Sequence, residues 1–407
     1  MLKDQKLDCY NTDIVICGGG ISGLIMAKSL INLGLRVTCI EKNQLQNQKV
    51  KSNDLRSTAL LHPAIDFFKE VGIWQNFENY AQPLNSLVIC NLNQKSGEID
   101  SNCEFLAEDL GIDTLGYNLP NKIIINELQK LMMATKNFLY LEGDYVEHIK
   151  PRSFDVVIKT NKKIQVTSKL IIAADGRYSN IREILKIKKI KYDYNQKALV
   201  FNIKHAYKHD SKSYEIYKSE GPCTLVPLKT KQLNGYFSSV VLMIDNNKNN
   251  DKIFVDKERL SEFITQRTGN ILGDCTVQSE VSNFSIISQA SLALSSERMI
   301  LLAEAAHVLP PIGAQGLNTS IHDIKILYYL IEKRLKNNEE IGTFEFVKEY
   351  ENLRKKQISS RMLSVHFLNK LSISKNQIVS DIRKFGLSFL SNNQMSTKIA
   401  MKFGMFQ

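Results

Sequence analysis

The chain has 407 residues and no long hydrophobic run, which argues against a protein that crosses a membrane with helices. None of its apolar segments approaches the ~18 residues that a membrane-spanning helix needs. The N-terminal sequence MLKDQKLDCYNTD also lacks the apolar core of a secretory signal peptide. The composition, 43% hydrophobic and 23% charged, is that of an ordinary globular protein, and the length predicts two or three lobes. We therefore expect a cytoplasmic protein.

Cysteine is scarce and scattered. The seven cysteines include no C-x-x-C pair, so neither a disulfide framework nor a zinc site is expected. Several lie in apolar, strand-like segments, where cysteine behaves as a small hydrophobic residue. The sequence also has no internal repeat and no nucleic-acid recognition motif, so we expect neither a metal site nor a nucleic-acid partner.

Acidic residues are few at the C-terminal end. The formal net charge is +11, and residues 351–407 hold ten Lys/Arg against two Asp/Glu, a net of +8. A solvated basic helical surface explains this excess. Attraction to an anionic membrane surface or to an acidic partner explains it equally well.

Glycine is concentrated near the N-terminus, in TDIVICGGGISGLIMAKSLINLGLRVTCIEKN (12–43). The order is apolar strand, glycine turn, helix, strand, which predicts a βαβ unit. Gly18, Gly20 and Gly23 form G-x-G-x-x-G, which permits a tight turn, a close approach to a pyrophosphate and close packing of helix on strand. Glu41 follows eighteen residues after Gly23, where a carboxylate accepts ribose hydroxyl protons. This context predicts a dinucleotide site at the helix N-terminus.

The rest of the chain alternates between helical and strand-like sequence patterns. Residues 54–75 read as a loop and a helix that Gly72 ends, residues 117–135 as a second helix, and residues 154–176 as three short strands. The segment 190–290 is rich in strand-like runs, which predicts an inserted antiparallel sheet to which 81–116 contributes. Apolar residues recur every three or four positions from 317 to 335, which predicts a long helix.

Two further stretches place an acidic residue at the end of a strand, beside residues that form turns. Asp175-Gly176 ends a strand in IIAADGRYSNIR (171–182). Glu304 ends another strand in LLAEAAHVLPPIGAQGLNTSIHD (301–323), before a loop of prolines and glycines that leads into the long helix. A loop with so many residues of special backbone geometry is typical of a binding site.

In order and spacing, the three stretches resemble the single-component FAD-dependent aromatic hydroxylases of the p-hydroxybenzoate hydroxylase class. Within that class ALLHPAIDFFKEVGIW, LGYNLPN and IGAQGLNTSIHD are most similar to the UbiH/UbiF-type ubiquinone-biosynthesis hydroxylases. The resemblance implies an α/β fold, with a Rossmann-like FAD-binding domain, an inserted antiparallel β-sheet substrate domain and a C-terminal helical region. It places the FAD-binding domain at 1–80, 117–189 and 291–335, the substrate domain at 81–116 and 190–290, and the helical region at 336–407.

The resemblance also implies which residues hold FAD. They are Gly18, Gly20, Ile21, Ser22, Gly23, Glu41, Lys42, Arg56, Asn121, Asp175, Gly176, Glu304, Gly313, Gly316, Leu317 and Asn318. The N–H groups of Leu317 and Asn318 would stabilise charge on the reduced flavin, and the Pro311 region would lie beside the reacting oxygen. A surface arginine remains the alternative for Arg56, and a helix cap remains the alternative for Asn121. His307 and His322 are expected to be structural, and no catalytic base is assigned.

One position departs from the family pattern. Ala303-Glu304 stands where the family has Gly-Asp, whose aspartate binds the ribityl chain of FAD. Glutamate keeps the charge but adds a methylene, and Ala303 adds a Cβ at a place of close approach. We expect FAD binding to persist. The alternative is a non-catalytic flavin-binding scaffold of a quinone-biosynthetic complex.

The implied activity is hydroxylation of the ring of a polyprenylated phenol in ubiquinone biosynthesis, through a flavin C4a-hydroperoxide. Oxygen would be the co-substrate, and NAD(P)H or another donor the reductant. A soluble aromatic acid is the alternative substrate. Because a prenylated substrate lies in the membrane, we expect the basic C-terminal helices to associate peripherally with its inner face. Core or oligomer packing explains their apolar residues equally well.

Overall fold

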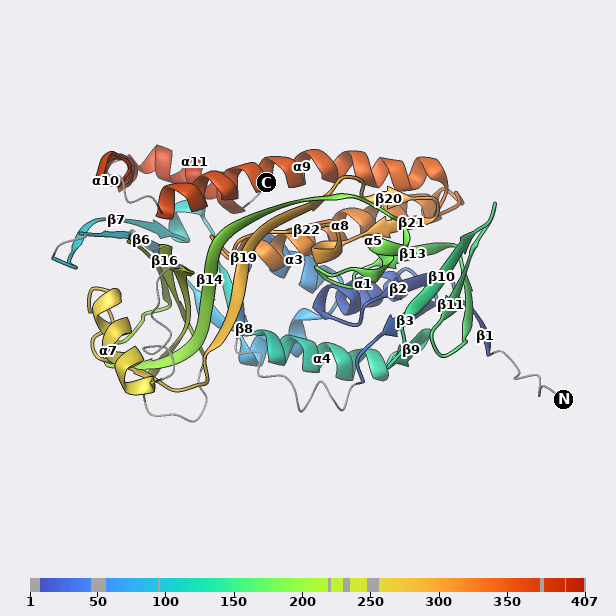
Figure 1. Cartoon of the computed structure of the whole chain (residues 1–407), viewed down its shortest axis with the longest axis horizontal. Helices are drawn as coiled ribbons and strands as arrows, with labels where there is room; N and C mark the ends of the chain where they lie inside the picture. Colours follow the sequence, from blue (N-terminus) through green and yellow to red (C-terminus); the bar gives the residue numbers. More distant parts are fainter. Residues whose placement is uncertain are drawn as a thin grey trace.

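The computed structural model of the chain shows α/β and antiparallel β parts joined by a long C-terminal helix (Figure 1). The residues that it describes are 8–44, 56–93, 96–218, 221–229, 235–246, 256–373, 377–391 and 393–405.

The first layer is a six-stranded sheet of order β20-β21-β13-β2-β3-β9. Its strands are Ser295–Ser296 (β20), Met299–Leu301 (β21), Leu170–Ala173 (β13), Ile14–Cys17 (β2), Val37–Glu41 (β3) and Phe138–Glu142 (β9). All neighbours are parallel except β20 and β21. Every residue of β2, β3 and β13 is buried, as continuous apolar runs in a parallel sheet require.

The helices of this part begin and end where local signals predict. They are Ile21–Asn32 (α1), His62–Glu70 (α3), Asn121–Met133 (α4), Asn180–Ile184 (α5) and Gln315–Lys336 (α8). After α1 and α3, Gly34 and Gly72 adopt φ of +84° and +70°, the left-handed geometry that ends helices. The predicted βαβ unit and the long helix after residue 317 are therefore confirmed.

The prediction of a helix over 117–135 is wrong at its start. Gly116–Pro120 forms strand β8, which lies between Ser57–Leu61 (β4) and Gln82–Leu84 (β5) in a three-stranded sheet. Helix α4 begins only after Pro120. Local spacing missed both β4 and β8 because their hydrogen-bond partners are distant in sequence: Ser57 pairs with Pro120 and Leu61 with Gly116.

The second large layer is a nine-stranded sheet of order β22-β19-β14-β17-β16-β15-β6-β7, with β18 beside β14. Its strands are His307–Val308 (β22), Ser282–Ser291 (β19), Lys189–His205 (β14), Tyr236–Asp245 (β17), Gly221–Pro227 (β16), Lys212–Lys218 (β15), Ser86–Leu92 (β6), Ile99–Leu106 (β7) and Cys275–Val277 (β18). All pairs are antiparallel except β15 with β6. The predicted inserted sheet, with a contribution from 81–116, is confirmed. Helix Lys257–Arg267 (α7) packs Leu260 and Ile264 against one face.

A small four-stranded sheet completes the α/β part. Its strands are Cys9–Asn11 (β1), Gln165–Ser168 (β12), Val156–Thr160 (β11) and Val146–Pro151 (β10). With β13, the strands β11 and β12 are the three short strands predicted for 154–176. Single-turn helices occupy Trp74–Asn76 (η1), Glu78–Tyr80 (η2), Glu108–Leu110 (η3) and Ala303–Ala305 (η4).

The C-terminal region is helical, as predicted. Its helices are Phe344–Ile373 (α9), Gln377–Ser391 (α10) and Gln394–Met405 (α11). Helix α9 runs along both large sheets, and α10 and α11 lie beside β6 and β7 (Figure 1). Leu387 and Met401 pack there against Cys103 and Phe105. Within the described residues, no helix is long and apolar enough to cross a membrane.

Candidate FAD site

The glycine turn between β2 and α1 requires glycine at two of its positions. Gly18 has φ of +108°, and a Cβ on it would lie 2.4 Å from the carbonyl oxygen of Ala174. A Cβ on Gly23 would lie 1.9 Å from the carbonyl oxygen of Gly18. Gly20 is different, because a Cβ there meets no atom within 4 Å. The turn is therefore packed tightly against its own sheet but open at Gly20, where α1 begins.

Glu41 ends β3 and hydrogen-bonds the glycine turn. Its Oε2 accepts from the backbone N–H of Gly19 at 2.7 Å. Its Oε1 accepts from the backbone N–H and the side-chain amide of Asn43, at 2.8 and 2.7 Å. The side chain is thus fixed beside the turn, at the place where the spacing predicts a ribose ligand. Lys42 follows with its side chain exposed to solvent.

Two buried polar atoms near this turn have no partner among the described residues: the hydroxyl of Tyr140 and Oδ1 of Asp175. The Tyr140 hydroxyl would lie 2.4 Å from a Cβ on Gly19. Burial raises the pKa of Asp175, although hydrogen bonds from Ser179 and from backbone N–H groups oppose the shift. Buried polar atoms are nearly always paired, so unpaired ones beside an open turn fit a site for a polar ligand.

The second and third motifs meet in space. Arg177, two residues after Asp175, reaches Glu304, with Nη2 3.4 Å from Oε1. Arg182 is fully buried and donates to the carbonyl of Ala305 at 2.9 Å and to that of Arg177 at 2.9 Å. The Glu304 side chain is 46% exposed, so its carboxylate can reach a ligand.

Ala303 occupies a backbone conformation that favours glycine. Its φ is +57°, yet it is 4% exposed and its N–H donates to Oδ2 of Asp323 at 3.0 Å. The left-handed region costs an L-residue about 1–2 kcal/mol. The departure from the family pattern therefore lies at a strained point that Asp323 stabilises.

Asp323 is the centre of a buried network that sequence reasoning missed. Besides Ala303, it accepts from Nε2 of His307 at 2.7 Å and from Nε of Arg354 at 2.7 Å. Burial alone would raise the pKa of Asp323, but His307 and Arg354 outweigh burial and lower it to about 2. The carboxylate is therefore ionised and can only accept, so Nε2 of His307 carries a proton. This network agrees with the structural role expected of His307.

Asn318 joins the first turn of α8 to strand β4. Its Oδ1 accepts from the N–H of Leu61 at 2.9 Å, and its Nδ2 donates to the carbonyl of Ala59 at 2.8 Å. The N–H groups at the start of α8, among them that of Leu317, belong to a helix end with no side-chain cap. The side chain of Asn318 thus positions this helix end, and we still expect its backbone to face the flavin.

Arg56 and Asn121 lie together at the start of β4, where the N–H of Asn121 donates to the carbonyl of Arg56 at 2.9 Å. The guanidinium of Arg56 lies 4.8 Å from the ring centroid of Phe284, in the nine-stranded sheet. Oδ1 of Asn121 accepts from the hydroxyl of Thr58 at 2.6 Å. The alternative that Asn121 caps α4 is wrong, because Pro120 occupies the N-cap position.

The proline and glycine loop packs against the nine-stranded sheet. Ile312 is 3% exposed and lies in an apolar cluster with Ala198 and Met243. Glu215 of β15 is buried and accepts hydrogen bonds from the N–H of Gly313 and, at 2.5 Å, from the hydroxyl of Tyr217. Burial raises the pKa of Glu215, while these two bonds oppose the shift. Pro311 itself is exposed, beside the buried Pro310.

The members of the predicted cofactor set lie after the C-terminal ends of β2, β3, β13 and β21, on α1, just before β4, at the start of α4, and in the loop and first turn of α8. The open Gly20, the fixed Glu41, and the Tyr140 hydroxyl and Asp175 Oδ1 that lack partners among the described residues fit a dinucleotide. Which atoms of the cofactor each residue touches remains a prediction.

Comparison with known proteins agrees with this geometry. Residues 11–357 match the family described as FAD binding domain. The chain belongs to this family. It is 26% identical to ubiquinone hydroxylase UbiM of Neisseria meningitidis, over 84% of this chain and 73% of that protein. It is 24% identical to the mitochondrial ubiquinone biosynthesis monooxygenase COQ6 of Dictyostelium discoideum, over 93% of this chain and 88% of that protein.

Solved structures show the same fold. The p-nitrophenol 4-monooxygenase PnpA of Pseudomonas putida superposes with a TM-score of 0.80 at 16% identity, over 97% of each chain. The predicted fold, the FAD cofactor and the class of FAD-dependent monooxygenases are thereby confirmed.

Proposed function

We propose that the chain hydroxylates the aromatic ring of a polyprenylated phenol in ubiquinone biosynthesis. The named functions of the relatives support this substrate class over a soluble aromatic acid. The observation that carries the proposal is the contact between the loop of prolines and glycines before α8 and the nine-stranded sheet. Ile312 packs on Ala198 and Met243 there, in an apolar cluster that also holds Tyr194, Ile286 and Val365, and Glu215 accepts a hydrogen bond from the N–H of Gly313.

FAD, when bound, supplies the oxygen activation, and the protein positions it and excludes water. The turn at Gly20 and the N-terminus of α1 would hold the pyrophosphate. Glu41 would hold the ribose and Glu304 the ribityl chain. The N-terminus of α8 would stabilise the negative charge of the reduced ring. Ile312 and Pro310 are both buried, so they exclude water from this side of the loop.

A soluble aromatic acid needs a cation beside its carboxylate. The guanidinium of Arg56 lies over the ring of Phe284, and Arg361 donates to the side chain of Gln315 at the start of α8, so both cations already have partners. The hydroxylase and monooxygenase names of the relatives favour an enzyme over the non-catalytic flavin-binding scaffold.

We further propose that the C-terminal helices rest on the inner face of the membrane, where a quinone-biosynthetic complex has access to the substrate. Large apolar side chains are exposed along them: Leu363 and Phe367 on α9, Phe385 and Phe389 on α10, and Met395 and Ile399 on α11. Exposed aromatic residues near lysines are typical of interfacial helices.

Vesicle sedimentation tests this surface. Changing Phe367, Phe385 and Phe389 to Ser should release the protein from phosphatidylglycerol vesicles. Phe154→Ser is the control, because Phe154 is 78% exposed but lies between β10 and β11. Equal retention of all variants would refute membrane docking and leave core or oligomer packing.

The substrate is tested by complementation. The gene is expressed in strains that each lack one ubiquinone-ring hydroxylase, and quinone intermediates are identified by mass spectrometry. Rescue of one strain assigns the ring position. Failure in every strain, with FAD-loaded protein present, contradicts the quinone assignment.

NAD(P)H is the proposed reductant. The rate at which NADH and NADPH reduce the flavin without oxygen tests this proposal.

A further inference from the structure

Three buried polar atoms lie at the nine-stranded sheet without a hydrogen-bond partner among the described residues. They are Oγ of Ser213 on β15, Oγ of Ser239 on β17, and Oδ1 of Asn118, which reaches the sheet from β8. The three residues are 7%, 1% and 1% exposed, respectively. We call them the polar cluster. Because buried polar atoms are nearly always paired, three such atoms in one place indicate a bound polar ligand.

The register of the strands places the polar cluster around Val226 of β16. Val226 lies opposite Ser239 of β17. On its other side, the register of β15 and β16, continued by one residue, brings Ser213 opposite Val226. The side-chain amide of Asn118 donates to the carbonyl of the next residue, Pro227, at 2.8 Å. Neighbouring strands lie ~4.8 Å apart, so the two serines lie roughly 10 Å apart with an apolar side chain between them.

The two serines lie on the face of the sheet that meets the loop before α8. Side chains two positions apart on a strand share a face. Ser213 therefore shares the face of Glu215, which accepts a hydrogen bond from a backbone N–H of the loop. Ser239 shares the face of Met243, which packs on Ile312 of the same loop. The polar cluster thus lies ~7 Å along β15 from the contact between loop and sheet.

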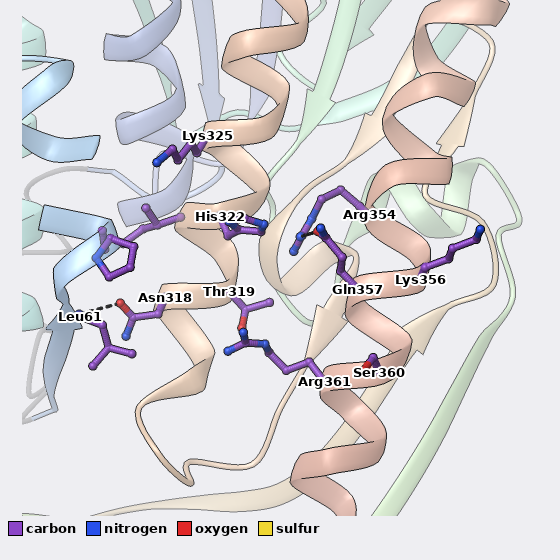
Figure 2. A pocket seen from close by; sticks show the side chains of 13 residues that line it. Leu61, Asn318, Thr319, His322, Lys325, Arg354, Lys356, Gln357, Ser360 and Arg361 are labelled. Atoms are coloured by element: carbon purple, nitrogen blue, oxygen red, sulfur yellow. Dashed lines mark hydrogen bonds between the residues drawn. The ribbon is translucent and has the colours of Figure 1, made fainter. Parts of the chain in front are cut away.

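Asn118 connects the polar cluster to the strands that hold the start of α8. It pairs with Ala59 of β4 in the three-stranded sheet. Nδ2 of Asn318 on α8 donates to the carbonyl of Ala59, and Figure 2 shows the hydrogen bond between Asn318 and Leu61 of the same strand. Because Asn318 belongs to the predicted flavin site, the polar cluster lies between that site and the nine-stranded sheet.

The chemistry of the three atoms defines what they bind. A carbonyl only accepts, so the atom of Asn118 that contacts Pro227 is the nitrogen, and the partnerless atom is an oxygen that accepts from a hydroxyl group. The serine hydroxyls can donate to an oxygen that carries no hydrogen, such as that of a methoxyl or carbonyl group. All three side chains are uncharged, so the cluster suits a neutral ligand with oxygen substituents.

We propose that the polar cluster holds the oxygen substituents of the substrate ring. The phenolic hydroxyl donates to Asn118, a second ring oxygen accepts from Ser213 or Ser239, and Val226 contacts the ring itself. The inference rests on the proposed function, which supplies the aromatic ring, and it names the groups of that ring that the protein recognises.

Ligand binding without turnover tests this proposal. The FAD-loaded full chain, oxidised and without a reductant, is titrated with 2-methoxyphenol and with toluene in a calorimeter. We expect 2-methoxyphenol to bind at least ~10-fold more tightly, because it forms at least two hydrogen bonds that toluene cannot form. One neutral hydrogen bond contributes a factor of ~2–10.

The double variant Ser213→Ala/Ser239→Ala should raise the Kd of 2-methoxyphenol ~5-fold or more and leave that of toluene within twofold. Because both hydroxyls lack a partner in the described part of the chain, the unfolding temperature without ligand should stay unchanged or rise. The matched control is Ser238→Ala, on the opposite face of β17. Ser238 is equally buried, but its Oγ bonds Nε2 of His205 at 3.0 Å. This control should lower the unfolding temperature and keep both Kd values within twofold.

A third ligand, methoxybenzene, isolates Asn118 because it lacks the hydroxyl donor. The wild type should prefer 2-methoxyphenol to methoxybenzene, and Asn118→Leu should lose this preference.

Equal affinity of the wild type for 2-methoxyphenol and toluene would overturn the proposal. An undiminished preference in the serine double variant would also overturn it. The proposed function is tested separately by complementation. If no strain is rescued while the serine double variant loses the preference, the quinone assignment fails and the subsite for ring oxygens stands.

Discussion

The network around Asp323 permits a quantitative prediction, because this one carboxylate of α8 accepts hydrogen bonds from Ala303, from His307 and from Arg354 of α9. Asp323→Asn keeps the shape of the side chain but offers one acceptor where Ala303, His307 and Arg354 need several. Removal of one partner of a buried ion pair costs ~3–5 kcal/mol, because it leaves the other charge uncompensated. The side chains of Asp323 and Arg354 are 0% and 1% exposed, so solvent cannot replace the lost partner.

The same network predicts a pH dependence. The pKa of Asp323 is lowered from 3.8 to about 2 in the folded chain. Because the pKa of Asp323 is lower in the folded state than in the unfolded state, its ionisation stabilises the folded state, and this stabilisation is complete above the unfolded pKa. This contribution, about 2 kcal/mol, is lost as the pH falls from about 4 to about 2.

Urea unfolding at a fixed FAD concentration measures both effects. At pH 7 Asp323→Asn should lose ~3 kcal/mol or more of unfolding free energy, and between pH 4 and 2 its stability should fall less steeply than that of the wild type. Asp66→Asn is the control, because Asp66 is 52% exposed and pairs with His62 on the surface, where ~0–1 kcal/mol is expected. A loss under 1 kcal/mol for Asp323→Asn would refute the network as a stabilising element.

Two further predictions concern the cofactor. Gly23→Ala should unfold the FAD-binding part, since its Cβ would lie 1.9 Å from a backbone oxygen, whereas Gly20→Ala should keep the unfolding temperature and lower FAD affinity ~10-fold or more. Thermal unfolding and FAD titration check this pair, and equal effects of both changes would contradict it. Glu304→Ala should lose flavin on purification while Glu304→Asp retains it. Full retention by Glu304→Ala, measured from flavin absorbance, would remove the role of that carboxylate.

Much of the predicted cofactor site follows from local sequence. The glycine spacing, Glu41 and the Asp175-Gly176 pair each combine a residue type with a strand end, and parallel strands bring those ends to one edge of a sheet. The helix that begins at Gln315 is predicted by apolar residues that recur every three or four positions. Local patterns succeed here because βαβ geometry places neighbouring elements of sequence side by side.

Other parts of the site depend on contacts between distant residues. Asp323 is the last residue of the third stretch, but nothing local shows that it meets Arg354, thirty-one positions later. In the sequence Glu215 is one polar residue of an alternating strand pattern. Only the fold shows that it accepts a hydrogen bond from the N–H of Gly313. Strand β8 was misread as helix because its pairing with β4 spans about sixty residues.

The sequence by itself determined the FAD-binding class and predicted a set of cofactor residues, because turns, caps and strand ends are dictated by neighbours along the chain. It also showed that Ala303-Glu304 departs from the family pattern. The tertiary structure alone decided that Ala303 has a positive φ held by Asp323, and that the loop of prolines and glycines before α8 packs on the nine-stranded sheet. It alone brought Asn118, Ser213 and Ser239 around Val226, because long-range packing places side chains whose spacing in sequence carries no signal.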